Sequence, residues 1–239
     1  MTYSFELLDK ACKKFDLSIT DQQKIQFIKY HEVLTEWNKV VNLTRITDFH
    51  EVIVKHFVDS LAIIRVLDMN TVKTMIDVGT GAGFPGVPIK IMFPHIAVTL
   101  LDSSGKRIEF LDFIIDKLEL SNTVAVHGRA EEFGVKKEYR EKYDLAVSRA
   151  VSNLSVLSEL CLPFVKVDGS FVSYKSGKSA DEVDGAKPAI GLLGGDVKEF
   201  TVFNLLELDL QRSLVRIDKI SDTPLKYPRR PGMPAKKPL

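Results

Sequence analysis

The chain of 239 residues has 45% hydrophobic and 27% charged residues, and its 33 Lys and Arg nearly balance its 32 Asp and Glu, which gives a formal net charge of +1. This composition is that of an ordinary globular protein. The balance excludes nucleic-acid binding through overall charge, so any such affinity must come from a local basic patch.

The sequence indicates neither a membrane anchor nor a metal site. No apolar run approaches the ~20 residues that a spanning helix needs, and no signal peptide is visible. The two cysteines, Cys12 and Cys161, lie far apart and match no metal-ligand spacing. We therefore expect a soluble, cytoplasmic, monomeric protein with no membrane and no metal among its partners.

Residues 1–70 are predicted to form an N-terminal helical cap. Apolar residues recur at helical spacing in two segments, namely Tyr30, Val33, Leu34 and Trp37, and then Ile53, Phe57, Leu61 and Ile64. Asp48, with Glu51 three positions later, resembles a capping box that opens the second helix. Residues 37–47 are predicted to be a polar turn. One side of the second helix would turn His56 and Asp59 toward the mouth of a site, and for His56 the alternative is a partly buried helix histidine.

A short strand followed by glycines is the central segment. Residues 72–78 are apolar except for a few positions such as Asp77, which is typical of a buried parallel strand. Gly79, Gly81 and Gly83 then predict a turn whose backbone N–H groups are open to a ligand. Prolines at 85 and 88 place the next helix at residue 86 or later. This segment predicts a nucleotide-type cofactor site.

Strands and helices alternate over residues 71–222. Further strands are predicted at 96–101, 123–126, 144–147 and 171–174. Ser103 or Ser104 is expected to cap a helix that buries Ile108, Leu111, Ile115 and Leu118. A second helix, 154–161, ends before Pro163. Residues 177–195 are predicted to be a loop with a short helix, and 200–208 and 214–220 a hairpin. The fold class is therefore α/β, a Rossmann-like, doubly wound sheet that is mostly parallel with an antiparallel edge strand.

Residues 223–239 form a tail of different composition. The tail holds five of the ten prolines and five basic residues, with no acid after residue 222. Such a segment cannot be a central strand or a helix. It is either a solvated, partly disordered terminus or a basic arm laid over a phosphate backbone.

The glycine turn admits two cofactors. Dinucleotide enzymes use G-x-G-x-x-G before a helix that faces a pyrophosphate, but here the third glycine comes one residue early and Phe84 follows it. Asp102 closes the second strand 19 positions after Gly83, where an acid receives ribose hydroxyls. Both NAD and S-adenosylmethionine carry a ribose. The glycine spacing, the Phe-Pro pair and the terminal hairpin favour S-adenosylmethionine.

Eight segments in order resemble a single family. They are WNKVVNLT (37–44), HFVDS (56–60), DVGTGAGFPG (77–86), LLDSSGKRIEFL (100–111), RAEE (129–132), SRAVSNL (148–154), FVSYKSG (171–177) and YPRRPGMPAKKPL (227–239). Over almost its whole length the chain resembles the bacterial ribosomal RNA small subunit methyltransferase G family, RsmG or GidB. The resemblance implies a class I S-adenosylmethionine-dependent methyltransferase that converts one guanine of 16S rRNA to 7-methylguanosine and releases S-adenosylhomocysteine. Its partner would be 16S rRNA, the small ribosomal subunit or an assembly intermediate.

The resemblance also implies roles for residues at matching positions. The methionine end of the cofactor would lie against Gly79 and Phe84, beside Gly81 and Gly83. The ribose would be held by Asp102, Ser103 and Ser104, and the adenine would lie beside Ala130 and Glu131. Arg149 would reach the cofactor or the incoming guanine.

The chemistry of guanine N7 agrees with these residues. N7 has an in-plane lone pair and no proton, so its methylation needs positioning rather than a general base. Amine methylation often uses an Asn/Asp-Pro-Pro-aromatic loop, and the corresponding segment here is Ser148-Arg149-Ala150. Arg149 is expected to donate to guanine O6 or stack on the base, and the alternative is an ordinary ion pair with Glu131 or Asp144.

A basic patch is expected to face the RNA. Lys175 ends the fifth strand at the ligand-binding edge of the sheet and is the second residue, after Arg149, that we predict to act in the transfer. The other expected contributors to RNA binding are Lys106, Arg107, Arg229, Arg230, Lys236 and Lys237. Their phosphate contacts would make binding salt-sensitive. For Lys106 and Arg107 the alternative is solvated surface charge.

Three other functions remain open at this point. The first is an S-adenosylmethionine-dependent methyltransferase with a small-molecule or protein substrate. The second is an NAD-dependent oxidoreductase, and the third is a non-catalytic RNA-binding module with the same fold.

Overall fold

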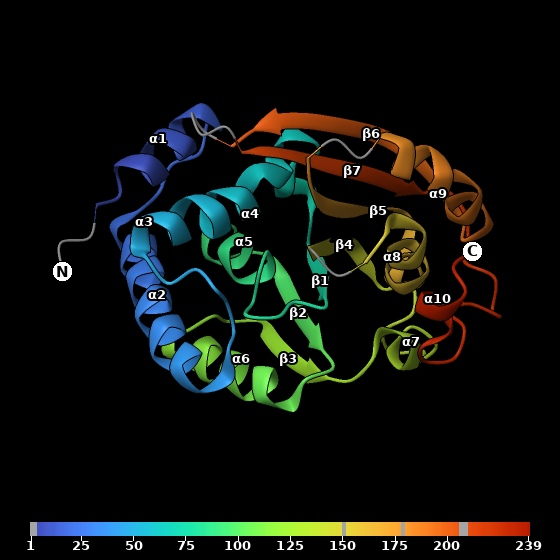
Figure 1. Cartoon of the computed structure of the whole chain (residues 1–239), viewed down its shortest axis with the longest axis horizontal. Coiled ribbons are helices and arrows are strands. Elements are labelled where there is room, and N and C mark those ends of the chain that lie inside the picture. The colour runs from blue at the N-terminus through green and yellow to red at the C-terminus, as the bar shows by residue number, and fades with distance from the viewer. Residues whose placement is uncertain (1–3, 150–151, 178–179, 206–209) are drawn as a thin grey trace.

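The computed structural model describes residues 4–149, 152–177, 180–205 and 210–239. A seven-stranded sheet runs through the molecule in the order β3-β2-β1-β4-β5-β7-β6 (Figure 1). The strands are β1 (Thr74–Val78), β2 (Ala97–Asp102), β3 (Thr123–His127), β4 (Tyr143–Arg149), β5 (Val165–Ser176), β6 (Gly195–Asn204) and β7 (Gln211–Lys219). The first five are parallel, and β7 pairs antiparallel with both β5 and β6. The predicted fold class and terminal hairpin are confirmed.

Helices cover both faces of this sheet. The cap elements α1 (Glu6–Lys14), α2 (Asp21–Val41), α3 (Phe49–Val52), η1 (Ile53–Val58), α4 (Asp59–Leu61), η2 (Ala62–Arg65) and η3 (Met69–Thr71) precede β1. The helices that follow are α5 (Gly86–Met92), α6 (Gly105–Lys117), α7 (Ala130–Phe133), α8 (Leu154–Cys161), η4 (Leu162–Phe164), α9 (Ala180–Leu192) and α10 (Met233–Lys236). In Figure 1 the cap and α6 lie on one side of the sheet, and α8, α9 and α7 lie on the other.

The two faces of the sheet bury separate cores because side chains alternate along each strand. On β1, Met75 packs with the cap, α5 and α6, whereas Ile76 packs with α8 and α9. The same alternation separates Leu100 from Leu101 on β2. The near-continuous apolar runs in the sequence reflect this burial on both faces.

Several predicted boundaries are wrong. Residues 37–41 are the last turn of α2 rather than part of a polar turn, and the second cap helix is interrupted by η1, a π-helix. On α6, Leu111 and Leu118 are buried as predicted and Ile108 and Ile115 pack partly buried against the core, but Phe110 and Ile114, which were not predicted, are buried as well. The segment expected to be mostly loop contains the 13-residue helix α9. Residues 206–208 of the predicted strand 200–208 lie outside the described residues.

The C-terminal tail is folded onto the domain, so the disordered interpretation is wrong. Arg140 donates to the carbonyl oxygens of Thr223 (2.5 Å) and Tyr227 (2.8 Å). The backbone N–H of Gly232 donates to Glu131 of α7 (2.9 Å). Contrary to expectation the tail also contains one helical turn, α10, with a proline in its first turn, where the missing N–H costs nothing. The tail thus follows α8 and α7 along the side of the sheet (Figure 1).

Lys219 at the end of β7 fastens the start of the tail. Its ammonium group is buried and donates to the carbonyl oxygens of Leu162 (2.9 Å) and Val165 (3.1 Å), to the Glu141 carboxylate (3.1 Å) and to the Thr223 hydroxyl (2.8 Å). Burial lowers the pKa of Lys219, and these acceptors compensate for the loss of hydration.

We expect Lys219→Met to lower the free energy of unfolding by about 3 kcal/mol, because buried acceptors and a carboxylate lose their donor. Urea denaturation measures the change. The control is Lys187→Met on α9, where an exposed lysine pairs with Asp184 and the expected change is below about 0.5 kcal/mol. Equal effects of the two substitutions would contradict the anchoring role.

Candidate functional site

A cleft of about 1110 Å³ opens at the carboxyl ends of the parallel strands, where ligands bind in open α/β sheets. Strands β1, β2, β4 and β5 each end in residues that line it, and the cap supplies the opposite wall. The lining includes Leu43, Thr44, Ile46, Lys55, His56, Asp59, Gly79, Thr80, Gly81, Ala82, Phe84, Asp102, Ser103, Arg107, Arg149, Ser152, Asn153, Tyr174, Lys175, Ser176, Glu182 and Arg212. The site therefore forms between the sheet and the cap.

The glycine turn after β1 presents bare backbone to this cleft. Gly79 (φ +71°) and Gly81 (φ +62°) line it, and both have the left-handed conformation that favours glycine. A Cβ at Gly81 would meet no atom within 4 Å. Gly83 (φ +92°) differs, since a Cβ there would lie 2.7 Å from Val87 and 2.8 Å from the Tyr30 hydroxyl. Gly83 therefore packs against Tyr30 of the cap and Val87 of α5, and it is not among the residues that line the cleft.

Asp77 stabilises the glycine turn through two hydrogen bonds. One of its carboxylate oxygens accepts hydrogen bonds from the Thr80 hydroxyl (2.7 Å) and the Gly86 backbone N–H (2.8 Å). Burial raises the pKa of Asp77 to about 6, despite these hydrogen bonds. From the sequence, Asp77 is predicted only as part of the strand. Its polar side chain within an otherwise apolar segment was the signal for this role.

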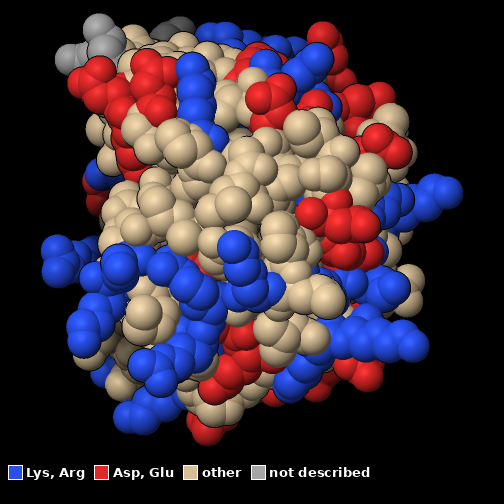
Figure 2. All heavy atoms as spheres, turned by 90° about the vertical axis from the view of Figure 1, so that its right-hand side faces the viewer, with Lys and Arg blue, Asp and Glu red and all other residues tan. Residues whose placement is uncertain are grey.

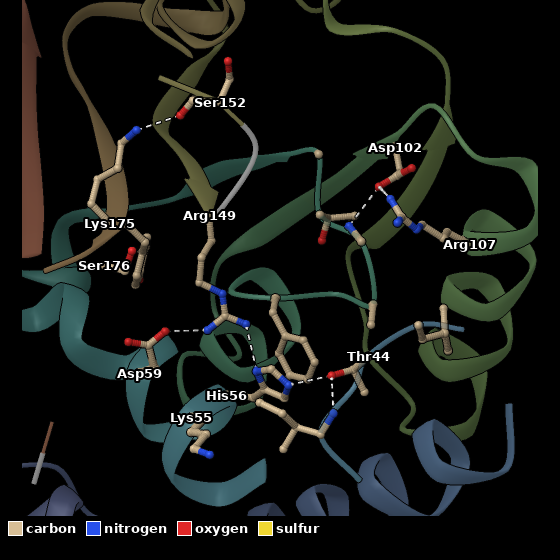
Figure 3. Close-up of a pocket in the computed structure, with 18 of the residues that line it drawn as sticks. Thr44, Lys55, His56, Asp59, Asp102, Arg107, Arg149, Ser152, Lys175 and Ser176 are labelled. Carbon is tan, nitrogen blue, oxygen red and sulfur yellow. Dashed lines mark hydrogen bonds and ion pairs between the residues drawn. The ribbon is translucent and has the colours of Figure 1, made fainter. Parts of the chain in front are cut away.

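Asp102 lies at the end of β2, as predicted, with its carboxylate only 3% exposed. It accepts from the backbone N–H of Gly81 (2.9 Å) and of Ser104 (2.9 Å), and Arg107 approaches it at 3.3 Å. Ser103 lines the cleft, whereas Ser104 is the N-cap residue of α6 without a side-chain cap bond. Asp102 thus ties the glycine turn to the start of α6, and Figure 3 shows it with Arg107 at one side of the cleft.

Arg149 extends from the end of β4 to the cap wall (Figure 3). Its guanidinium donates to Asp59 (2.7 Å), contacts the His56 ring nitrogen Nδ1 (3.4 Å) and lies 5.1 Å from the centre of the Phe84 ring. The ion pair is therefore with Asp59 and not with Glu131 or Asp144, the alternatives considered from sequence. Arg212 of β7, which the sequence analysis did not identify, approaches the other oxygen of Asp59 at 3.2 Å.

His56 is a neutral residue of this wall. Burial first, and then the neighbouring Arg149 guanidinium, lower the pKa of His56 to about 3. Because Arg149 donates to Nδ1, the proton of the neutral ring is on Nε2, which lies 3.0 Å from the Thr44 hydroxyl. The ring stacks on Phe84 with 4.4 Å between ring centres. Both of its nitrogens are thus occupied by protein groups.

Lys175 lines the cleft on the side opposite Asp102 and Arg107 (Figure 3). Its ammonium group donates to the carbonyl oxygen of Ser152 (2.7 Å) and to Glu182 of α9 (2.7 Å). Glu182 also accepts from the Leu154 backbone N–H at the start of α8 (2.6 Å). Lys175 therefore joins β5, α8 and α9 at the cleft mouth.

The structure gathers some of the predicted residues and leaves others apart. Arg107 is in the cleft on Asp102, whereas Lys106 is exposed outside its lining. Ala130 and Glu131 are also outside the lining, and Glu131 contacts the tail instead. Arg229 forms a two-nitrogen ion pair with the buried Glu159 of α8. Ala150 lies outside the described residues.

Charge gathers at two places. Five basic residues line the cleft (Lys55, Arg107, Arg149, Lys175, Arg212) against three acids (Asp59, Asp102, Glu182), an excess of two positive charges. Figure 2 shows the side of the molecule that carries α8, α9 and the tail, with Lys and Arg side chains gathered in its lower half. The exposed basic residues of the tail are Lys226, Arg230, Lys236 and Lys237. Both places suit an anionic partner.

The described ranges contain neither a membrane-spanning helix nor a cluster of metal ligands. None of their helices is long and apolar enough to cross a bilayer. Nor do they bring three or more His, Cys, Asp or Glu side chains together as a metal site.

Comparisons with known proteins give a consistent result. A family model described as rRNA small subunit methyltransferase G matches residues 23–214. Ribosomal RNA small subunit methyltransferase G of Desulforamulus reducens is 49% identical over 232 residues, which are 97% of this chain and 97% of that protein. The protein of the same name from Staphylococcus aureus strain Newman is 50% identical over 234 residues, 98% of each chain. A crystal structure of TYW2 from M. jannaschii in complex with AdoMet aligns with a TM-score of 0.50 at 13% identity, over 62% of this chain and 69% of that one. At this identity the structural likeness concerns the fold alone.

Proposed function

This chain belongs to the rRNA small subunit methyltransferase G family, GidB, and from that premise we propose that it methylates N7 of one guanine in 16S rRNA by direct transfer, without a general base. The family expected from the eight sequence segments is confirmed. The methyl donor is S-adenosylmethionine, in keeping with the family and the fold. The observation that carries the proposal is the position of Arg149, which lies in one cleft with the open glycine turn and Asp102.

The residues of the cleft fit S-adenosylmethionine. The bare backbone at Gly79 and Gly81 would admit the methionine end, and a side chain at Gly81 would project into open space. The buried carboxylate of Asp102 would receive the ribose hydroxyls. Phe84, with one ring face on His56, would contact the uncharged part of the donor. A dinucleotide suits the site less well, because Gly83 packs inward and Phe84 and Pro85 precede α5.

When bound, the donor supplies a methyl group on a positively charged sulfur, and transfer to N7 leaves the guanine ring positively charged. The contribution of this chain is to orient the base and exclude water. Arg149 would hold the base through O6 while leaving the N7 lone pair free. Lys175 would support the acceptor strand from the other side of the cleft. The neutral His56, bonded at both nitrogens, has no function as a base in this scheme.

The rate of methyl transfer is expected to be flat between about pH 7 and pH 9, because no group must lose a proton for the reaction. A single-turnover assay with saturating substrate measures it. In this range His56 is already neutral, since its pKa of about 3 lies far below, and Asp77 is ionised above its pKa of about 6. A rate that rises with an apparent pKa near 7 would contradict transfer without a base.

Arg230, Lys236 and Lys237 of the tail are proposed to contact RNA phosphates. We expect the double substitution Lys236→Gln/Lys237→Gln to reduce the slope of log affinity against log salt by about 1 to 2, since each lost phosphate contact removes roughly 0.7 to 0.9. Filter binding at several salt concentrations measures the slope. Lys13→Gln/Lys14→Gln, a second pair of adjacent exposed lysines in α1, is the matched control. Equal slopes for the two variants would remove the tail from the interface.

The test of the function itself is mass analysis of 16S rRNA. Cells that lack this protein should lose one 7-methylguanosine, and the purified protein with S-adenosylmethionine should restore it on RNA or small subunits from those cells. Restoration only on intact subunits or only on an assembly intermediate would identify the partner. Binding of NAD in place of S-adenosylmethionine would favour the oxidoreductase alternative. Transfer to a non-RNA acceptor, with 16S rRNA unchanged, would favour the other methyltransferase alternative.

A further inference from the structure

Asp59 joins two arginines that the sheet itself keeps apart. Arg149 is on β4 and Arg212 is on β7, and β5 lies between these strands. Asp59 reaches both from the cap, with one oxygen 2.7 Å from Arg149 and the other 3.2 Å from Arg212. Its side chain is 7% exposed. A buried carboxylate that uses both oxygens in this way fixes the guanidinium groups relative to each other.

The π-helix η1 sets the position of this carboxylate. It spans Ile53–Val58 immediately before α4, and both His56 within it and Asp59 after it line the cleft. Such insertions in helices often occur at functional sites because they change which side chains face a cleft. His56 contacts the same guanidinium that Asp59 holds. Two cap residues three positions apart therefore orient Arg149 together.

Both arginines keep donors for a ligand. Within the described ranges, the hydrogen bonds of Arg149 involve its two terminal nitrogens, and those of Arg212 involve Nε and Nη1. The Nε of Arg149 and the Nη2 of Arg212 have no hydrogen-bond partner within the same ranges. Both side chains line the cleft. The pair thus offers two N–H donor positions on groups held by one carboxylate.

We propose that Asp59 is a positioning residue, which holds Arg149 and Arg212 as one unit that binds the acceptor nucleotide. The inference rests on the proposed function. An arginine that binds guanine normally uses O6 and N7 together, but N7 must stay free to accept the methyl group. Arg149 must then donate to O6 alone, and its angle has to be fixed by the protein. Arg212 supplies the second donor, to the sugar or phosphate of the same nucleotide.

The carboxylate has a second effect on the same unit. Transfer moves the positive charge from the sulfur of the donor to the guanine ring, and two guanidinium groups beside that ring would oppose this movement. Asp59 reduces their summed charge from two to one without removing their N–H donors. Replacing Asp59 by a neutral residue is thus expected to affect kcat more than the affinity for the methyl donor.

Asp59→Asn tests the proposal, because it keeps the shape and removes the charge. We expect kcat on small subunits lacking the modification to fall ~100-fold and the Kd for RNA to rise ~10-fold. The Kd for S-adenosylmethionine, measured by calorimetry, should stay within about twofold. Asp59→Glu should recover part of kcat. The double variant Asp59→Asn/Arg212→Gln should have a kcat less than tenfold below that of Arg212→Gln alone, because the two residues act as a unit.

The control is Asp144→Asn. Asp144 lies near the amino end of β4, away from the cleft, and its carboxylate accepts hydrogen bonds from the backbone N–H groups of Lys73 and Thr74. Its substitution should lower the melting temperature with kcat retained. If Asp59→Asn keeps kcat within threefold, or loses donor affinity in proportion to kcat, the positioning role is overturned. Absence of transfer by the unaltered chain would instead overturn the proposed function, and with it the acceptor named here.

Discussion

Gly81→Val is expected to weaken S-adenosylmethionine binding by at least ~100-fold, or about 2.7 kcal/mol, and to abolish methyl transfer at ordinary donor concentrations. Two causes act together. Gly81 has a positive φ of +62°, which a β-branched residue adopts only with strain. Its Cβ would project into the cleft proposed for the donor, because Gly81 lines that cleft and no atom beyond its chain neighbours lies within 4 Å of this position. Isothermal titration measures the loss.

Gly232→Val is the matched control for this substitution. Gly232 also has a positive φ, +82°, and a Cβ there would likewise meet no atom within 4 Å, but this glycine lies in the tail. The backbone strain is therefore similar and the cleft is untouched. Donor affinity should stay within about twofold of the unaltered chain. If both variants lose affinity equally, backbone strain rather than occupation of the cleft explains the effect.

Arg149→Ala is expected to lower the rate of methyl transfer by ~100-fold to ~1000-fold, with a smaller effect on donor affinity. The substitution removes the donor proposed for guanine O6. It also leaves Asp59 with Arg212 as its ion-pair partner and leaves Nδ1 of His56 without its donor. Single-turnover kinetics on small subunits lacking the modification measures the rate, and calorimetry measures donor affinity.

A second substitution at this position separates charge from geometry. Arg149→Lys keeps the charge, but an ammonium group lacks the planar fork that contacts both Asp59 and His56. Its rate should therefore be only about tenfold above that of Arg149→Ala. Arg216→Ala is the control, since Arg216 lies on β7, pairs with Asp218 and is not among the residues that line the cleft. Its loss should reduce stability and leave the rate within threefold. A fully active Arg149→Lys would show that charge alone is required.

The sequence was most informative where function follows a strand directly along the chain. Gly79, Gly81, Asp102 and Arg149 all lie at or just after the end of a predicted strand, and all line the cleft. Parallel strands bring their carboxyl ends to one edge of the sheet, so local pattern was enough to place these residues together. The apolar runs that define the strands were equally clear, because both faces of the sheet are buried.

Contacts between elements distant along the chain could not be predicted in the same way. Asp59 and Arg212 are 153 residues apart and meet only because β7 inserts beside β5 and the cap covers the carboxyl edge. Neither residue carries a local signal for the pairing. The inward packing of Gly83 against Tyr30 likewise depends on where α2 crosses the turn.

The sequence by itself determined the α/β fold, the glycine turn, the acid at the end of β2 and the arginine at the end of β4, because each follows from short-range periodicity and spacing. Only the tertiary structure decided which charges are already paired. Arg229 is bound to Glu159 and Lys175 to Glu182, so these two basic residues of the predicted patch are not free cations in the fold. The physical reason is that electrostatic attraction depends on the distance between two charges in space and not on their separation along the chain.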